Sequence, residues 1–190
     1  MPFECQPDAG FIEWMAHSGG SLAITTYQAG KLLMVGWNGQ QISLLLRDFD
    51  KAMGLDVDGD RLLLATRYGV GLYANASALA PNYREPGRYD ALYLPRVEWP
   101  TPDLNIHDVA LVGDEIWMVA TRCNALVSPS AHYSFEPRWR PPFITDLVPE
   151  DRCHLNGLAM VEGKPGFVTA LGETDELVGW RDTKATGGIV

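Results

Sequence analysis

The sequence predicts an all-β fold, either a β-propeller or a propeller fragment of about four blades. A strand–turn–strand pattern recurs along the chain, and its copies lie about 50 residues apart, which is typical of propeller blades. In addition, 19 glycines and 13 prolines separate many short apolar runs, which favours strands and turns over long helices. The chain has 190 residues, 46% of them hydrophobic, so we expect residues 1–190 to form a single propeller-like domain.

Each copy of the repeat consists of an apolar strand, a glycine-containing turn and a second apolar strand. The three clearest copies cover residues 53–66, 107–121 and 156–171. Their turns contain Asp58-Gly59-Asp60, Gly113-Asp114 and Glu162-Gly163. Glycine and aspartate supply the positive φ angles that tight hairpins need, so each copy predicts a β-hairpin.

A fourth copy is visible from its second strand. Ser21–Thr26 resembles Leu62–Thr66, and a further strand is expected at Lys31–Gly36. Asn38-Gly39 is a strong two-residue hairpin signal, and it leads to another strand at Gln41–Leu46. This copy therefore has at least three strands.

A solenoid is the competing repeat architecture. β-Helix repeats are usually shorter than this period, and the 3.6-residue pattern of helical solenoids is absent from the sequence. Gly187–Val190 resembles the start of another turn and strand, so we expect an incomplete ring. Its open sheet edges would be covered either by another copy, in a homo-oligomer, or by the missing C-terminal half of a longer protein.

The formal net charge of −9 argues against nucleic acid as a partner, because an acidic surface repels phosphate backbones. The strongest basic cluster, Arg138–Arg140, is too small to change this. No apolar run reaches 18 residues, so no membrane span is predicted. Met1–Gly10 has no basic residues, so we expect no signal peptide.

Cysteine usage predicts reduced thiols in a cytoplasmic protein. The chain has three cysteines, Cys5, Cys123 and Cys153, and no CxxC pair. An odd number of well-separated cysteines argues against a disulfide framework and against a structural zinc site.

Four segments of the chain have distinctive sequences: Thr25–Leu32, Ile106–Asp108, Tyr133–Ile144 and Glu150–Ala159. Together they resemble DUF4915, a family of conserved hypothetical, propeller-like bacterial proteins. The resemblance extends from about Phe11 to Val190. It implies a longer domain with further repeats, including a Pro-His-Ser-Pro-Arg segment that this chain lacks. It implies no activity, because members of the family are mostly uncharacterised.

In a propeller, the first strand of each blade lines a central channel, and the loops that precede these strands meet at one mouth. His107 and His154 lie at such positions, and imidazoles can bind transition metals or relay protons. Asp108 could be a further ligand or could orient a histidine, and Asn156 could supply a carbonyl oxygen. The cofactor would then be a divalent metal ion. The alternative is structural, with these four groups bonded to the backbone at the strand starts.

Two kinds of metal chemistry fit this pattern by analogy. Asn156–Ala159 is similar to the segment that binds a divalent ion in gluconolactonase-like propellers, where the ion activates water for ester hydrolysis. Some oxygenase propellers instead place several histidines around ferrous iron. Both analogies depend on short motifs and on the fold.

Four other residues are candidates for ligand binding: Arg138, Trp139, Arg140 and Arg152. Two arginines beside an aromatic ring could hold a carboxylate or a phosphate, or stack on a ring. Alternatively, Arg138–Phe143 is a rigid crossover whose aromatic side chains fill space between blades. Glu150–Arg152 is interpreted as a loop ion cluster that positions His154, or as an exposed charged turn.

The sequence favours a binding or scaffold protein that recognises a small molecule, a peptide or a glycan at the channel mouth. The alternative is a metal-dependent hydrolase or oxygenase that uses the two histidines. A purely structural role is the third hypothesis. Motifs for nucleotide-binding loops, for a serine-hydrolase elbow and for HExxH metalloproteases are absent from the sequence.

Overall fold

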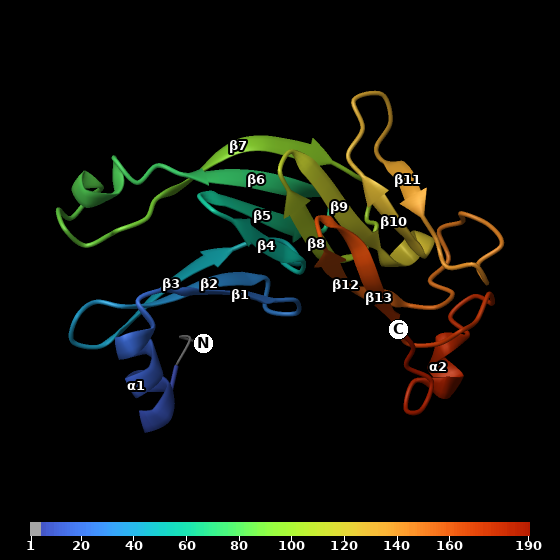
Figure 1. Cartoon of the computed structure of the whole chain (residues 1–190), viewed down its shortest axis with the longest axis horizontal. Helices are drawn as coiled ribbons and strands as arrows, with labels where there is room; N and C mark the ends of the chain where they lie inside the picture. The colour runs from blue at the N-terminus through green and yellow to red at the C-terminus, as the bar shows by residue number, and fades with distance from the viewer. Residues whose placement is uncertain (1–4) are drawn as a thin grey trace.

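The computed structural model describes residues 5–190, and this part of the chain is nearly all β. It contains 13 strands in four antiparallel sheets, and these described sheets do not close into a barrel. The sheets follow one another in chain order along an arc (Figure 1). The predicted all-β fold is confirmed, and the arrangement is compatible with a propeller-like fragment.

The first two sheets have three and four strands. The first has the order β1-β2-β3, with β1 at Leu22–Thr26, β2 at Lys31–Trp37 and β3 at Ile42–Asp48. The second has the order β4-β5-β6-β7, with β4 at Leu55–Asp58, β5 at Arg61–Thr66, β6 at Gly69–Asn75 and β7 at Tyr93–Pro100. A short 3-10 helix, η1 at Ala80–Asn82, lies in the long β6–β7 connection.

The other two sheets have four and two strands. The third has the order β11-β10-β9-β8, with β8 at Ile106–Val112, β9 at Glu115–Ala120, β10 at Ala125–Ser128 and β11 at Glu136–Trp139. The 3-10 helix η2 at Thr121–Cys123 joins β9 to β10. The fourth sheet pairs β12 at Leu155–Val161 with β13 at Lys164–Ala170.

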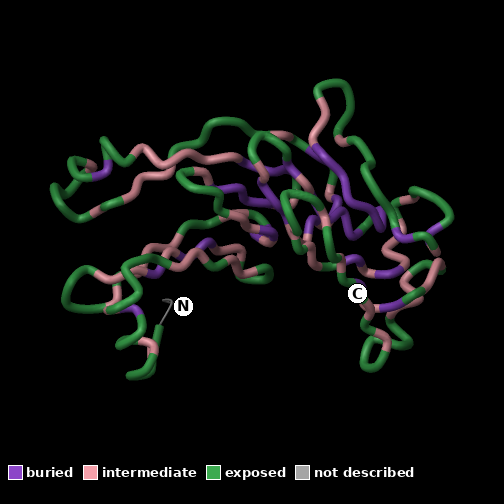
Figure 2. The backbone as a smooth tube through the Cα atoms, viewed as in Figure 1, coloured by how far each residue is buried: buried purple, intermediate pink, exposed green. Residues whose placement is uncertain are grey.

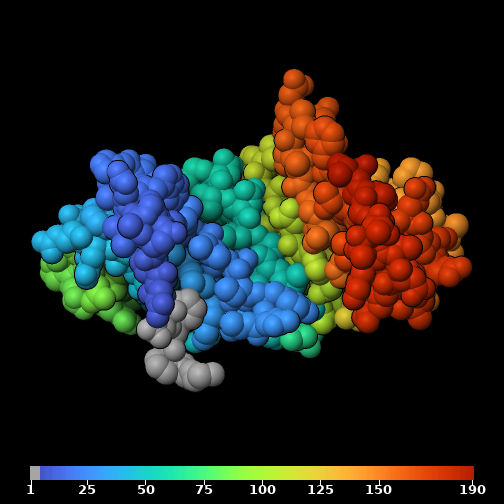
Figure 3. Space-filling view, turned by 90° about the horizontal axis from the view of Figure 1, so that it is seen from below, coloured from blue at the N-terminus to red at the C-terminus, as the bar shows by residue number. Residues whose placement is uncertain are grey.

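Two helices flank the sheets and lie apart in Figure 1. Helix α1 at Ala9–Ser18 starts where the Asp8 carboxylate accepts a hydrogen bond from Phe11 N at 2.7 Å, and it ends at Gly19, whose φ is +67°. The short helix α2 covers Trp180–Thr183. In the space-filling view, the blue N-terminal part and the red C-terminal part also lie at opposite ends (Figure 3). None of the described helices is long and apolar enough to cross a membrane.

The innermost strand of each sheet contacts the innermost strand of the next, in the order β1, β4, β8 and β12. Two aspartates connect these strands. Asp56 accepts a hydrogen bond from Leu111 N at 2.7 Å, and Asp108 accepts one from Leu158 N at 2.8 Å. Each carboxylate thus satisfies a backbone donor in the following sheet.

One backbone hydrogen bond recurs just after the second strand of three repeats. It runs from Arg67 N to Asp50 O (2.9 Å), from Arg122 N to Leu104 O (3.0 Å) and from Leu171 N to Cys153 O (3.1 Å). The three segments that the sequence identifies as copies therefore share this hydrogen bond.

Two threonine hydroxyls also connect successive sheets. The hydroxyl of Thr25 in β1 donates to Met53 O at 2.6 Å, just before β4, and Thr121 after β9 donates to Leu155 O at 2.5 Å, at the start of β12. On its inner side, β1 has no strand partner among the described residues. At the other end of the chain, Ile189 pairs with Ala170 of β13, as expected from the sequence of 187–190.

The hydrophobic core lies between successive sheets (Figure 2). The largest cluster joins the second and third sheets and includes Leu63, Val70, Met118 and Val127. Smaller clusters join the third sheet to the fourth and the first to the second. Each sheet is therefore buried by its neighbours, as in other repeat architectures.

All three cysteines are free, with Cys5 exposed and Cys123 and Cys153 buried. Burial raises the pKa of Cys153 to about 12, so this thiol stays protonated and is a poor nucleophile. The cytoplasmic location stays a prediction. The first four residues of Met1–Gly10, where we expect no signal peptide, lie outside the described residues.

Candidate functional site

Three residues at equivalent repeat positions have a left-handed backbone. Lys51, Asn105 and His154 have φ values of +58°, +54° and +52°, and each precedes the innermost strand of its sheet. Residues with side chains rarely adopt this conformation, and such strain persists where the surroundings enforce it, often at functional sites.

His107 is held as a neutral imidazole. Asn105 Nδ2 donates to its Nε2 at 2.9 Å, and its Nδ1–H donates to Asn156 Oδ1 at 2.9 Å. Burial lowers the pKa of His107, and the positive charge of Lys51 lowers it further, although the hydrogen bond to Asn156 opposes this. Both ring nitrogens form hydrogen bonds, so His107 of β8 acts here as a structural link to Asn156 of β12.

His154 has a different environment. Its Nδ1–H donates to Asp151 Oδ2 at 2.6 Å, and its ring lies 4.8 Å from that of His107 and 4.4 Å from that of Trp180 between centroids. Its Nε2 forms no hydrogen bond within residues 5–190. The Asp151 carboxylate therefore orients the imidazole and leaves one nitrogen available. This agrees with the interpretation of Glu150–Arg152 as a loop that positions His154.

The same region contains most of the unsatisfied polar atoms in the described part of the chain. Four buried side-chain atoms have no hydrogen-bond partner, and three of them surround His154: Asn105 Oδ1, Asp151 Oδ1 and Trp180 Nε1. Buried polar atoms are usually bonded, so such a concentration indicates a place where a further polar group binds.

Asp108 does not turn its carboxylate toward the histidines. One oxygen accepts from Val109 N at 2.9 Å and the other from Leu158 N at 2.8 Å. Burial raises the pKa of Asp108. The structure thus brings His107, His154 and Asn156 together, as the sequence predicts, whereas Asp108 connects strands. Among residues 5–190, no group of three or more His, Cys, Asp or Glu side chains could hold a metal ion. The metal centre stays a prediction.

A cluster of three cations surrounds Asp103, which lies just before β8. Lys51 Nζ is 3.0 Å from its carboxylate, Arg67 Nη1 is 3.3 Å away and Arg122 Nη2 is 3.8 Å away. Although burial opposes it, the bond to Lys51 and the charge of Arg122 lower the pKa of Asp103. Arg67 also contacts both oxygens of Asp50, at 3.1 and 2.9 Å. We call Lys51, Arg67 and Arg122 the cationic cluster.

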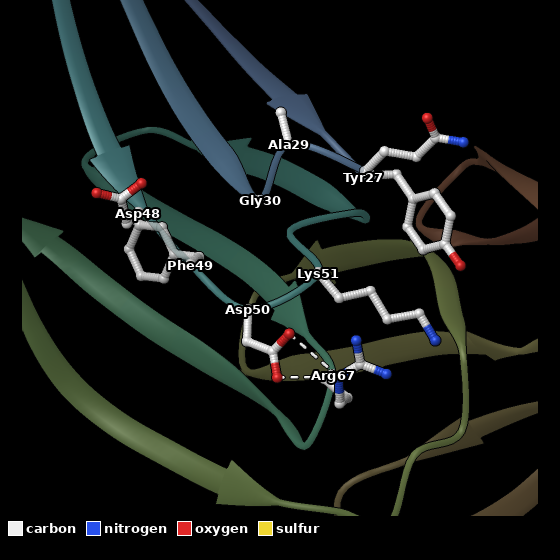
Figure 4. A pocket seen from close by; sticks show the side chains of 9 residues that line it. Tyr27, Ala29, Gly30, Asp48, Phe49, Asp50, Lys51 and Arg67 are labelled. Carbon is white, nitrogen blue, oxygen red and sulfur yellow. Dashed lines mark hydrogen bonds and ion pairs between the residues drawn. The ribbon is translucent and has the colours of Figure 1, made fainter. Parts of the chain in front are cut away.

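Two members of this cluster, Lys51 and Arg67, line an open cavity of about 570 Å³ (Figure 4). Tyr27, Phe49, Asp50, Lys51 and Arg67 are among the residues that line it. The side chains of Tyr27 and Lys51 extend in the same direction in Figure 4, and Lys51 Nζ lies 5.7 Å from the centre of the Tyr27 ring. The cavity therefore combines positive charge with an aromatic surface.

The cationic cluster is not among the site residues that the sequence predicts. A signal for it was present, since Arg67 and Arg122 both follow an Ala-Thr pair at the end of the second strand in two copies. Tyr27 follows Thr25-Thr26 at the corresponding place in β1. Extending the repeat alignment by one residue would have identified these three side chains.

The arginine-rich candidates lie elsewhere. Arg138 and Trp139 belong to β11, the outermost strand of the third sheet, and Arg140 follows it. Arg138 stacks on the Trp117 ring at 4.6 Å, and Trp139 is 42% exposed. The structure therefore does not bring this segment to the inner strands, and binding there stays a prediction.

Arg152 is occupied by two carboxylates. Its guanidinium contacts Glu150 at 2.9 Å and Asp175 at 2.8 Å, and its side chain is only 13% exposed. It therefore fixes the loop that precedes β12, and ligand binding by Arg152 stays a prediction.

We expect the free energy of unfolding to fall as the pH is lowered through 6.5, the ordinary pKa of histidine. Because folding lowers the pKa of His107, the unfolded chain binds the proton first, and stability decreases until the pH reaches the lower, folded pKa. The slope should approach about 1.4 kcal/mol per pH unit. Urea titrations between about pH 7.5 and pH 5.5 measure it. His107→Gln should flatten the slope, and the exposed His132→Gln should not; equal slopes in all three proteins would contradict the prediction.

The comparisons with known proteins give one match. The model of the domain of unknown function DUF4915 matches residues 9–190, which agrees with the range of the resemblance found in the sequence. No curated protein and no solved structure matches the chain significantly. The family match covers essentially the whole chain, and the chain therefore belongs to the DUF4915 family.

Proposed function

We propose that this protein binds an anionic small molecule at the mouth formed by the starts of its inner strands. The proposal includes the interpretation of the four sheets as successive propeller blades, whose inner strands line a channel. One observation carries it: Lys51, Arg67 and Arg122 converge on the single carboxylate of Asp103, beside an open cavity.

The local charge supports an anion. Three cations face two carboxylates, those of Asp50 and Asp103, in a chain whose formal net charge is −9. A third carboxylate, that of Asp48, lines the cavity and is paired with Lys31. A site with excess positive charge on an acidic protein attracts an anion locally and repels extended polyanions. The Lys51 side chain is only 8% exposed, and a buried ammonium is stabilised by every anion near it.

The geometry favours a carboxylate or a phosphate as the bound group. A guanidinium presents several N–H donors in one plane, which matches the paired oxygens of these anions. Arg67 is 37% exposed and already contacts two carboxylates, so its remaining donors can reach a ligand in the cavity. The cavity volume lies within the range of small-molecule sites.

Titration calorimetry with inorganic phosphate at low ionic strength tests the proposal. We expect saturable binding to the wild type and an affinity at least about tenfold lower for Arg67→Gln, since charge-assisted hydrogen bonds contribute about 1.5–3 kcal/mol. Arg61→Gln is the matched control. Arg61 lies at the other end of β5 and also contacts two aspartates, Asp58 and Asp114.

Two results would overturn the proposal. One is a wild type that shows no saturable heat with phosphate. The other is the same loss of affinity in both arginine variants, because a general charge effect would then explain the binding.

A further inference from the structure

We infer that the ligand is a polyhydroxylated anion, such as a sugar acid, whose hydroxyls bind at His154, Asn105 and Trp180. The inference rests on the proposed anion site. That site binds the charged group of the ligand, and the inference adds the uncharged part, which carries the hydroxyls. It comes from the unsatisfied polar atoms next to the cationic cluster.

The unsatisfied atoms include hydrogen-bond acceptors and a hydrogen-bond donor. Asn105 Oδ1 and Asp151 Oδ1 are acceptors, and Trp180 Nε1 is a donor. His154 Nε2 is a further acceptor, because its Nδ1 already donates to Asp151. A hydroxyl group can donate and accept at once, so a polyol matches this mixed set. A carboxylate alone would face two acceptors, and an apolar group would leave all of these atoms without partners.

Hydrogen bonds connect this group of atoms to the cationic cluster. Asp103 Oδ1 accepts from Lys51 Nζ at 3.0 Å and from Asn105 N at 3.2 Å. The Asn105 side chain then bonds to His107, whose ring lies 4.8 Å from that of His154. The charge of Lys51 is also among the causes of the lowered His107 pKa. Asp103 and Asn105 therefore link the cationic cluster to the two histidines.

Aromatic rings border both parts of this mouth. Tyr27 lines the cavity and is 51% exposed, and the Trp180 ring lies 4.4 Å from that of His154. Rings of this kind present apolar faces and a polar tip. Sugar rings likewise have apolar C–H faces and polar edges, so the two surfaces are complementary.

Three probes of similar size separate charge from hydroxyls: glucuronate, cyclohexanecarboxylate and glucose. Titration calorimetry at low ionic strength should show glucuronate binding at least about tenfold more tightly than either of the others, because a site built to bond hydroxyls rejects an analogue that lacks them. Glucose lacks the anion that the cationic cluster requires.

Two variants test the assigned residues. Trp180→Phe removes the indole N–H together with the five-membered part of the ring and keeps an aromatic side chain, and His154→Asn removes Nε2 with a residue that tolerates a left-handed backbone. Each should lower the preference for glucuronate over cyclohexanecarboxylate severalfold. Trp14→Phe is the control, because Trp14 lies on α1 and is 50% exposed.

The outcomes distinguish the two proposals. If glucuronate and cyclohexanecarboxylate bind equally, the inference is overturned, the anion site stands, and water alone serves the unsatisfied atoms. If neither carboxylate binds but inorganic phosphate does, the inference is overturned and the anion site stands. If phosphate does not bind either, the proposed function fails and the inference fails with it. A preference for glucuronate that is unchanged in both variants would refute the assignment of Trp180 and His154.

Discussion

Replacing Asn124 by alanine is expected to lower the free energy of unfolding by about 4 kcal/mol, because several buried hydrogen bonds would be lost together. Asn124 is fully buried. Its Nδ2 donates to Glu150 O at 2.6 Å, and its Oδ1 accepts from Arg152 N at 2.9 Å and from Cys153 N at 3.1 Å. Its φ of +54° is a further reason, since alanine tolerates a left-handed backbone less well than asparagine.

Urea denaturation followed by tryptophan fluorescence measures this loss. Asn38→Ala is the matched control, because Asn38 Oδ1 also accepts from two backbone N–H groups, those of Gln40 and Gln41, but in an exposed turn. Its loss should be about 1 kcal/mol or less. Similar losses in the two variants would contradict the role of burial.

Asn124 also matters for the site. It lies between η2 and β10, and its side chain fixes the loop that carries Asp151 and leads to His154. A substitution of Asn124 that destabilises the protein less than alanine does should therefore weaken glucuronate binding as well as stability. The residue connects the core of the third sheet to the mouth.

The second large effect is expected at Gly54, where the chain of the second sheet passes closest to that of the third. A Cβ atom at this position would lie 2.8 Å from Asp108 C, 2.9 Å from Asp108 Cα and 2.9 Å from Val109 N. These are backbone atoms, which cannot rotate away as a side chain can. Gly54→Val should therefore force β4 and β8 apart and destabilise the protein by about 3 kcal/mol or more.

The midpoints of thermal unfolding of the Gly54→Val and Gly20→Val variants test this prediction. A Cβ at Gly20 would meet no atom within 4 Å, and no positive φ applies there. We expect a much lower midpoint for Gly54→Val and almost no change for Gly20→Val. A wild-type midpoint for Gly54→Val would show that the two inner strands are not in close contact.

The sequence alone was sufficient for the all-β fold and for the positions of most strands. Strand and turn signals are local: alternating apolar residues form strands, and pairs such as Asn38-Gly39 form hairpins. The structure confirms that hairpin between β2 and β3, with a φ of +94° at Gly39. The sequence also indicated that His107, His154 and Asn156 would meet, because the repeat places them at the starts of inner strands.

Only the tertiary structure decided what each side chain contacts. The carboxylate of Asp108 bonds to Leu158 N of the next sheet, and Arg138 and Trp139 lie on the outermost strand of theirs. Asp103 collects cations that are far apart in the sequence. The position of a residue in the repeat predicts where its backbone lies. The direction and the partner of its side chain depend on how neighbouring sheets pack. At Lys51 and His154 they also depend on the left-handed backbone. The sequence thus determined the sheets of this protein. The packing between the sheets determined which side chains meet at the starts of the inner strands.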